Sequence, residues 1–316
     1  MQAFRFFAIA SAGLAFALAI LGSWVRINEA GMTCPDWPLC RGALVPRLIG
    51  GVVLEWSHRA IALSVGFFII GAFITGWRVR RSVAGVQQTL IALVAIFVMQ
   101  VAVGGWTIKV ANSPESVAVH WAAAMALLAT LTVLSLLSIV APPPRATRTS
   151  SGSRSAVLLL ALAAAFGFIA MCIGSYVSSS HFGLACSTLP ACDGTLLGRD
   201  PGQFAQMLHR WAALSFFIVG AFATWRTAAN GTPRSRVGTI AIVALVLVVL
   251  QIGLGIGNVV FHMPMLLREA HAANAVVSFL AYVIAAFFAA LDPVASRVTP
   301  TAGGVRVASG VMASSK

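Results

Sequence analysis

The sequence predicts an all-α integral membrane protein whose eight transmembrane helices form two pseudo-symmetric four-helix bundles. Hydrophobic residues make up 59% of the 316 residues and charged residues only 9%, whereas charged residues are roughly a quarter of a soluble domain. Long apolar segments and repeated sequence words complete the pattern. We expect a lipid bilayer as surroundings. Despite the net charge of +13, we expect no nucleic-acid partner, because the cations sit in small clusters between uncharged runs.

A bilayer core requires about 20 apolar residues per helix. The first apolar segment is longer than the ~7–15 residues of a signal-peptide core and lacks a convincing cleavage site, so we expect a retained helix. In chain order, the expected spans are 6–25, 60–77, 89–108, 117–140, 156–177, 208–225, 237–257 and 270–291.

The distribution of charge predicts the orientation of these spans. Arg and Lys near helix ends mark the cytoplasmic side of a membrane, so we expect both termini in the cytoplasm. The longer loops, after the first and fifth spans, then lie outside with seven of the eight acidic residues. The residues expected on the cytoplasmic side are Arg5, Arg78, Arg80, Arg81, Arg145, Arg148, Arg154, Arg226, Arg234, Arg236, Arg297, Arg306 and Lys316, together with the acid Asp292.

A polar, helix-breaking stretch divides the chain near its middle. Three prolines end at Pro144, and Arg, Thr and Ser dominate from there to Arg154, a composition typical of a linker. The last residues show little apolar periodicity. We expect an N-terminal bundle at 1–144, a cytoplasmic linker at 145–155, a C-terminal bundle at 156–296 and a flexible tail at 297–316.

The two halves carry matching sequence words, which predicts an internal duplication. Glu-Trp-Ser-His-Arg at 55–59 returns as Gln-Met-Leu-His-Arg at 206–210, an offset of 151 residues, and His120 returns as His271. Because each half holds an even number of spans, both halves enter the membrane in the same direction, and the repeat axis lies along the membrane normal. Further matches pair 22–25 with 174–177, 34–40 with 186–192 and 100–104 with 251–255.

Four of the six histidines form two matched pairs, His58 with His120 and His209 with His271. All lie towards the outer ends of even-numbered spans, so the two histidines of each half can face one another across a bundle. One such histidine taken alone is more often a hydrogen-bonding group. Opposed histidines on facing helices, however, hold metal cofactors, and haem iron accepts axial imidazole. We therefore expect bis-histidine haem. The absence of Cys-x-x-Cys-His from the sequence excludes covalent c-type attachment.

The main chemical difference between the halves is Glu55, whose repeat partner Gln206 cannot ionise. Glu55 lies three residues before His58, on the same face if the helix includes both. An acid near a membrane cofactor is a functional candidate, although a carboxylate at a helix N-terminus also interacts with the helix dipole. We hypothesise that the N-terminal half is catalytic and the C-terminal half holds a resident cofactor. Arg59 and Arg210 can pair with haem propionates or reach lipid headgroups.

Two cysteine pairs lie in the expected outer loops, Cys34 with Cys40 and Cys186 with Cys192. Disulfides persist outside the cytoplasm, and closing so short a ring would stabilise each loop by roughly 2 kcal/mol. A redox-active pair is the alternative, and a zinc site is less favoured because the pairs lie in separate halves. Cys172 lies within an expected span and is interpreted as a small core residue.

In these histidine, glutamate and cysteine positions the chain resembles the haem A synthases. These are membrane enzymes that oxidise a ring methyl of haem O to the formyl group of haem A for cytochrome oxidase assembly. The resemblance covers roughly residues 1–295. The paired outer-loop cysteines are similar to those of the bacterial form, which implies a multi-pass protein of the bacterial plasma membrane. The motifs that carry the resemblance are Glu55-Trp-Ser-His58-Arg59, Gly104-Gly-Trp-Thr107 with His120, Leu208-His209-Arg210, and Gln251-Ile-Gly-Leu-Gly255 with His271.

The resemblance implies that His209 and His271 ligate a haem b cofactor, and that His58 and His120 hold the haem O substrate or haem A product. It implies a catalytic role for Glu55 beside the substrate.

For the cysteines, the resemblance implies a functional Cys34–Cys40 pair that passes reducing equivalents and a structural Cys186–Cys192 disulfide. The implied partners are haem O, haem O synthase and an unidentified electron donor, and self-association into a homo-oligomer is left open.

One alternative is a di-haem b-type membrane cytochrome that only relays electrons, and another is a transporter or haem-handling assembly factor. A relay needs the same four ligands but has no use for an acid in one half alone, so Glu55 favours the enzyme. The parallel repeat and the lack of broken mid-membrane helices weigh against a transporter.

Overall fold

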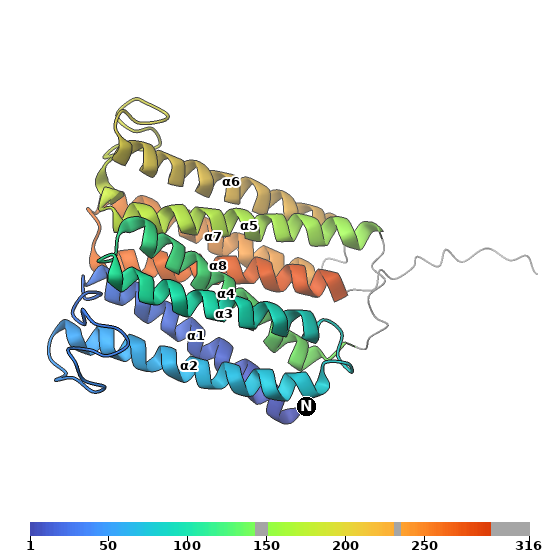
Figure 1. Ribbon diagram of the computed structural model, residues 1–316. Helices are drawn as coiled ribbons and strands as arrows, with labels where there is room; N and C mark the ends of the chain where they lie inside the picture. Colours follow the sequence, from blue (N-terminus) through green and yellow to red (C-terminus); the bar gives the residue numbers. More distant parts are fainter. Residues whose placement is uncertain (143–150, 231–234, 292–316) are drawn as a thin grey trace, which may run out of the picture.

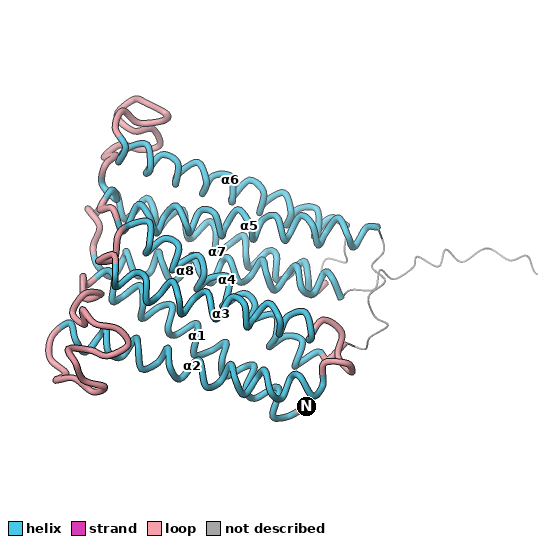
Figure 2. Tube along the Cα trace, in the orientation of Figure 1, coloured by secondary structure: helices cyan, strands magenta, loops and turns pink. Residues whose placement is uncertain are grey.

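A computed structural model of the protein describes residues 1–142, 151–230 and 235–291. Within these ranges, eight long helices and one short 3-10 helix make up the fold, and each long helix is apolar enough to cross a membrane (Figures 1 and 2). The prediction of an all-α, eight-helix membrane protein is confirmed. The elements are α1 (Gln2–Ile27), α2 (Gly51–Val79), α3 (Val86–Lys109), α4 (Pro114–Val140), α5 (Ser151–Ser179), η1 (Phe182–Leu184), α6 (Pro201–Asn230), α7 (Arg236–Val260) and α8 (Met265–Leu291).

Local sequence explains several of the helix starts. Ser113 precedes Pro114, the first residue of α4, and its hydroxyl accepts from the backbone N–H of Ser116. Ser235 caps α7 in the same way, accepting from the N–H of Gly238. Serine at the cap satisfies an amide that has no partner within the helix, and proline suits the first position because its missing N–H is not needed there.

The helices α2 and α6 begin well before the spans predicted from hydropathy. α2 begins at Gly51 rather than at residue 60, and α6 begins at Pro201 rather than at residue 208. Polar side chains such as Glu55, Arg59 and Gln206 interrupt the apolar sequence near these starts, so hydropathy excludes the early turns. These side chains find hydrogen-bond partners in the adjacent loops. As a result, the repeated histidine motifs lie inside helices rather than at their starts.

The halves meet through four helices. α1 packs on α8, and α4 packs on both α5 and α8, while α1 with α2 and α5 with α6 pack within their own halves. Two long connecting segments, 28–50 and 180–200, lie at the end of the bundle opposite the N-terminus, at the lower left and the upper left of Figure 1. We call this the loop end.

Parts of the predicted organisation lie outside the described residues. These parts are most of the predicted linker, up to residue 150, and the predicted tail. Residues 151–155, predicted to be part of the linker, instead begin α5. The charged residues of the topology prediction that fall outside are Arg145, Arg148, Arg234, Asp292, Arg297, Arg306 and Lys316.

Candidate functional site

A cavity of about 1620 Å³ extends from the loop end into the bundle. Its wall includes all four predicted ligands, His58, His120, His209 and His271. Typical small-molecule pockets measure roughly 300–1,000 Å³, so this cavity exceeds the usual volume of a site for one small molecule. The structure thus brings both histidine pairs to one shared space.

The histidines of the C-terminal half face each other, and both rings have further partners. The ring centroids of His209 and His271 are 6.3 Å apart. His209 Nδ1 lies 3.1 Å from the carbonyl oxygen of Ala170, and the amide nitrogen of Gln251 lies 3.2 Å from Nδ1 and 3.1 Å from Nε2 of His271. Asn274 in turn donates to the Gln251 oxygen at 2.8 Å. Such outer contacts orient metal-binding imidazoles in proteins.

The histidines of the N-terminal half are less tied down. Among the described residues, Nδ1 of His58 and Nδ1 of His120 are buried without a hydrogen-bond partner, as is the side-chain oxygen of Gln100. Gln100 reaches His120 Nε2 only at 3.4 Å, and Ala123 stands where the other half has Asn274. Buried polar atoms are rarely left unpaired, so this pair fits a ligand such as a metal-centred porphyrin.

Each of the four histidine rings packs against a glycine on a neighbouring helix. A Cβ atom at these positions would lie 3.1 Å or less from the ring, which is closer than ordinary van der Waals contact. The sequence contained the signal, because these glycines fall in the repeated words, but the histidine contact was not foreseen. The pairs are Gly22 with His58, Gly104 with His120, Gly174 with His209 and Gly255 with His271.

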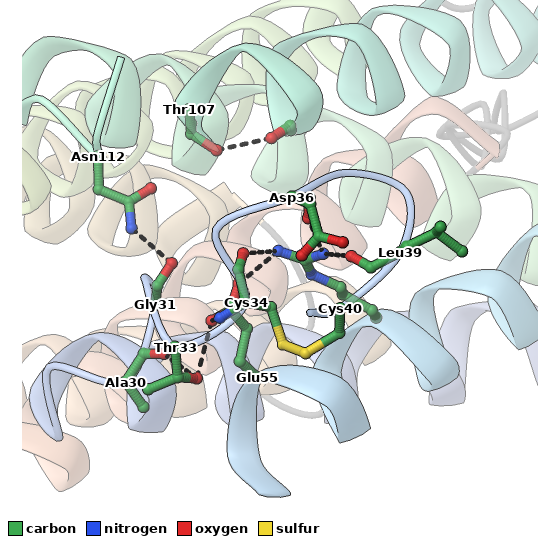
Figure 3. A network of polar contacts seen from close by, with 12 residues as sticks. Ala30, Gly31, Thr33, Cys34, Asp36, Leu39, Cys40, Glu55, Thr107 and Asn112 are labelled. Carbon is green, nitrogen blue, oxygen red and sulfur yellow. Dashed lines mark hydrogen bonds and ion pairs between the residues drawn. A yellow bond between two sulfur atoms is a disulfide. The ribbon is translucent and has the colours of Figure 1, made fainter. Parts of the chain in front are cut away.

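Glu55 is buried and joins the helix that carries His58 to the neighbouring loop (Figure 3). One carboxylate oxygen accepts from the backbone N–H of Cys34 at 2.7 Å and from the Thr33 hydroxyl at 2.9 Å. The other accepts from Arg59 at 2.6 Å. Glu55 also lines the cavity, so its negative charge lies both at the loop anchor and at the site.

Arg59 completes this anchor from the next turn of α2. Its guanidinium donates to the carbonyl oxygens of Cys34, Asp36 and Leu39 at 2.5–2.7 Å. Arg59 also lines the cavity. The contact with haem propionates proposed from the sequence stays a prediction, because in the structure this guanidinium holds loop carbonyls.

The C-terminal half repeats the anchor without the negative charge. Gln206 accepts from the backbone N–H of Cys186 at 2.5 Å, just as Glu55 accepts from Cys34. Arg210 donates to the carbonyl oxygens of Cys186 and Thr188 at 3.1 and 2.8 Å. Holding the loop is therefore common to both halves, and ionisation is what distinguishes Glu55.

Both predicted cysteine pairs are joined as disulfides, Cys34 to Cys40 and Cys186 to Cys192. The loop of the N-terminal half also covers the cavity, because its residue Trp37 forms part of the cavity wall. The Trp37 ring packs against Gly105 of α3, where a Cβ atom would lie 3.5 Å from the ring.

The same loop carries a half-buried aspartate, Asp36. Backbone N–H groups of Gly42 and Arg41 donate to its carboxylate and lower its pKa below the ordinary value. The turn after Asp36 is therefore held by a charged acceptor over most of the pH range.

With this geometry in place, comparison with known proteins decides the family. The sequence pattern of the family described as cytochrome oxidase assembly protein (COX15-CtaA) matches residues 5–49 and 51–283. The chain belongs to this family. The matched residues include both histidine pairs, Glu55 and all four loop cysteines.

Several proteins similar to this chain carry the name haem A synthase. The protein of Bacillus licheniformis is 26% identical over 255 residues, which cover 79% of this chain and 84% of the relative. The protein of Shewanella oneidensis is 26% identical and covers 87% of this chain and 94% of the relative. That of Symbiobacterium thermophilum is 24% identical, covering 81% and 85%. The resemblance drawn from the sequence is confirmed.

Proposed function

We propose that this cytochrome oxidase assembly protein is a haem A synthase, an oxidoreductase that converts a ring methyl of haem O to the formyl group of haem A. The observation that carries the proposal is the arrangement of two histidine pairs on one cavity, with Glu55 in the wall near His58 and the non-ionising Gln206 at the equivalent place near His209. The name shared by relatives that match most of the chain supports it.

The C-terminal half, 156–296, would hold a resident haem b through His209 and His271. The contacts of these rings with Ala170 and Gln251 support this assignment, because they fix the ring orientation before any ligand arrives. A permanently bound cofactor benefits from such preorganised ligands.

The N-terminal half, 1–144, would receive haem O and release haem A through His58 and His120. The unpartnered Nδ1 atoms of these rings support an exchangeable ligand here, since the rings are less firmly held. When bound, haem supplies the redox chemistry. Glu55 would act as the catalytic acid or base nearest the substrate, and Arg59 keeps that carboxylate in place.

The remaining assignments concern the surroundings of the enzyme. We place it in the bacterial plasma membrane with both termini in the cytoplasm, which puts the disulfide loops outside. Haem O synthase would supply the substrate, and an electron donor outside the membrane would act through Cys34–Cys40. A homo-oligomer is left as a hypothesis that size measurement in detergent can test.

Expression in a host that makes haem O but no haem A, followed by pigment extraction, tests the function. A haem A synthase should yield haem A in the extract. Two tightly bound copies of haem b, with no haem A, would instead indicate an electron relay.

Two variants then test the division of labour. His58→Ala should abolish haem A while haem b stays bound, and His209→Ala should release haem b. The opposite result would reverse the assignment of the halves.

A further inference from the structure

Two arginines without a counterpart in the other half line the loop end of the cavity. Arg26 lies in the last turn of α1, and Arg268 lies in the first turn of α8. At the offsets of the repeat, their places are taken by Ser178 and Val117, which also line the cavity. The cations are therefore confined to the α1–α8 contact between the halves and are absent from the equivalent α4–α5 contact.

Arg268 lies one helical turn from a histidine of one pair, and Arg26 lies one turn from a glycine that packs against a histidine of the other pair. Arg268 precedes His271 by three residues, which places both on one face of α8. Arg26 follows Gly22 by four residues, and Gly22 packs against His58. The two guanidinium groups thus belong to the rim between the two histidine pairs.

Both guanidinium groups keep donors to spare. Arg26 donates to the Ser178 carbonyl oxygen at 2.6 Å and to the Ser179 hydroxyl at 3.3 Å, which leaves most of its five N–H groups free. The side chain of Arg268 makes no hydrogen bond within the described ranges. By contrast, Arg59 is occupied by loop carbonyls and Glu55.

Nearby acids do not neutralise the two charges. Neither arginine forms an ion pair with an acid of the described ranges, whereas Arg59 pairs with Glu55. Glu269 accepts from the Ser23 hydroxyl at 2.8 Å and does not line the cavity. Glu29 lines the cavity, and its negative charge attracts Arg26. The positive charge of Arg268 acts on Arg26 in the opposite sense.

We infer that Arg26 and Arg268 form a carboxylate-binding site that anchors the propionates of a porphyrin at the loop end of the cavity. The inference rests on the proposed function, which supplies the porphyrin. Guanidinium groups bind carboxylates through charge-assisted, often bidentate hydrogen bonds. The cavity's other features are duplicated in the two halves, but the two arginines lie only at the contact between α1 and α8. Their positive charges therefore give the porphyrin a defined orientation, with its carboxylates towards that contact.

Haem binding to the purified full chain, stripped of pigment and followed by absorption titration, tests this site. The ligands are ferric haem and its dimethyl ester, which lacks the carboxylates. Arg268→Gln and Arg26→Gln should each weaken binding of haem about ten-fold and leave binding of the ester unchanged. Lys109→Gln is the matched control, because Lys109 ends α3 at the same end of the bundle but does not line the cavity.

The outcomes separate the inference from the function on which it rests. If an arginine variant loses affinity equally for haem and for its ester, or loses affinity for neither, the carboxylate site is overturned. Arginines that bind lipid phosphate instead of the porphyrin would give the second of these results. Arg26→Lys retains a charge and should recover part of the affinity for haem, whereas damage to the α1–α5 contact would lower binding of both ligands. If His58→Ala, His209→Ala and their double variant all bind haem like the wild type, the proposed function fails instead.

Discussion

At the residue scale, Glu55 and Gln206 make the same backbone contact, but only Glu55 can ionise and pair with the following arginine, whereas the Gln206 amide donates to the Gly183 carbonyl oxygen. Each accepts a hydrogen bond from the first cysteine of its loop. The Glu55→Gln variant should therefore keep the loop anchored, fold normally and retain haem b, yet lose about 100-fold in haem A formation if the carboxylate transfers a proton. Pigment analysis of the expressed variant measures both quantities.

The control for this prediction is Glu55→Ala, which removes the loop contact as well as the charge. It should lose activity and also expose the loop to protease. Full turnover of Glu55→Gln would contradict a catalytic role and leave Glu55 as a positioning residue for the loop.

The glycines behind the histidine rings allow a second prediction. A Cβ atom at Gly255 would lie 3.1 Å from His271 Cε1, whereas one at Gly253 on the same helix meets nothing within 4 Å. Gly255→Ala should displace the ring, destabilise the protein by about 1–3 kcal/mol and weaken haem b binding. Absorption spectra of the purified variants provide the measurement, and Gly253→Ala should match the wild type. Equal behaviour of the two variants would show that the ring tolerates the methyl group.

At the element scale, α2 carries a histidine ligand candidate and the loop anchor on consecutive turns. The loop 28–50 is held by Glu55, by Arg59 and by the Cys34–Cys40 disulfide. Replacing both cysteines by serine should lower loop stability by roughly 2 kcal/mol without unfolding the bundle. Trypsin cleavage at the exposed Arg41, monitored by mass spectrometry, should accelerate accordingly.

Combining the serine replacements with Arg59→Gln should release the loop further, because the side-chain anchor is then lost as well. A loop as resistant as the wild type after loss of the disulfide would mean that the side chains of α2 hold it alone. The equivalent serine variant at Cys186 and Cys192 is the matched control in the other half.

The sequence was sufficient for the helices but not for their first turns. Apolar runs identified all eight elements, because membrane spans must be apolar over their whole length. The starts of α2 and α6 were missed because residues such as Glu55 and Arg59 are polar, and only the folded loop supplies their partners. For the same reason the loop carbonyls bound by Arg59 were not foreseen, whereas the histidine pairs followed from the repeat.

At the scale of the whole molecule, contacts between distant parts of the chain join the halves. Ser23 of α1 donates to Glu269 of α8 across a separation of 246 residues, and Arg26 reaches Ser178 across 152. Both contacts depend on residues that break the repeat, so a comparison of the halves could not predict them. These contacts join the halves beside the single cavity that all four histidines line.

This architecture predicts that haem stabilises the entire protein. A ligand that binds only the folded state at 100 times its Kd adds about 2.7 kcal/mol, so removal of haem should lower the thermal unfolding temperature in detergent. His209→Ala should lose this increment, and His58→Ala should keep it, because the resident haem is assigned to the C-terminal half. An increment that survives in His209→Ala and disappears in His58→Ala would place the resident haem in the other half.

The shared loop anchor at Glu55 and Gln206 has a consequence for the history of the duplication. Codons for glutamate and glutamine differ by a single base, and either side chain can accept the amide hydrogen of the loop cysteine. One point mutation can therefore change the charge at this position while preserving the anchor. Two initially identical copies could have diverged in chemistry at this position without passing through a misfolded ancestor.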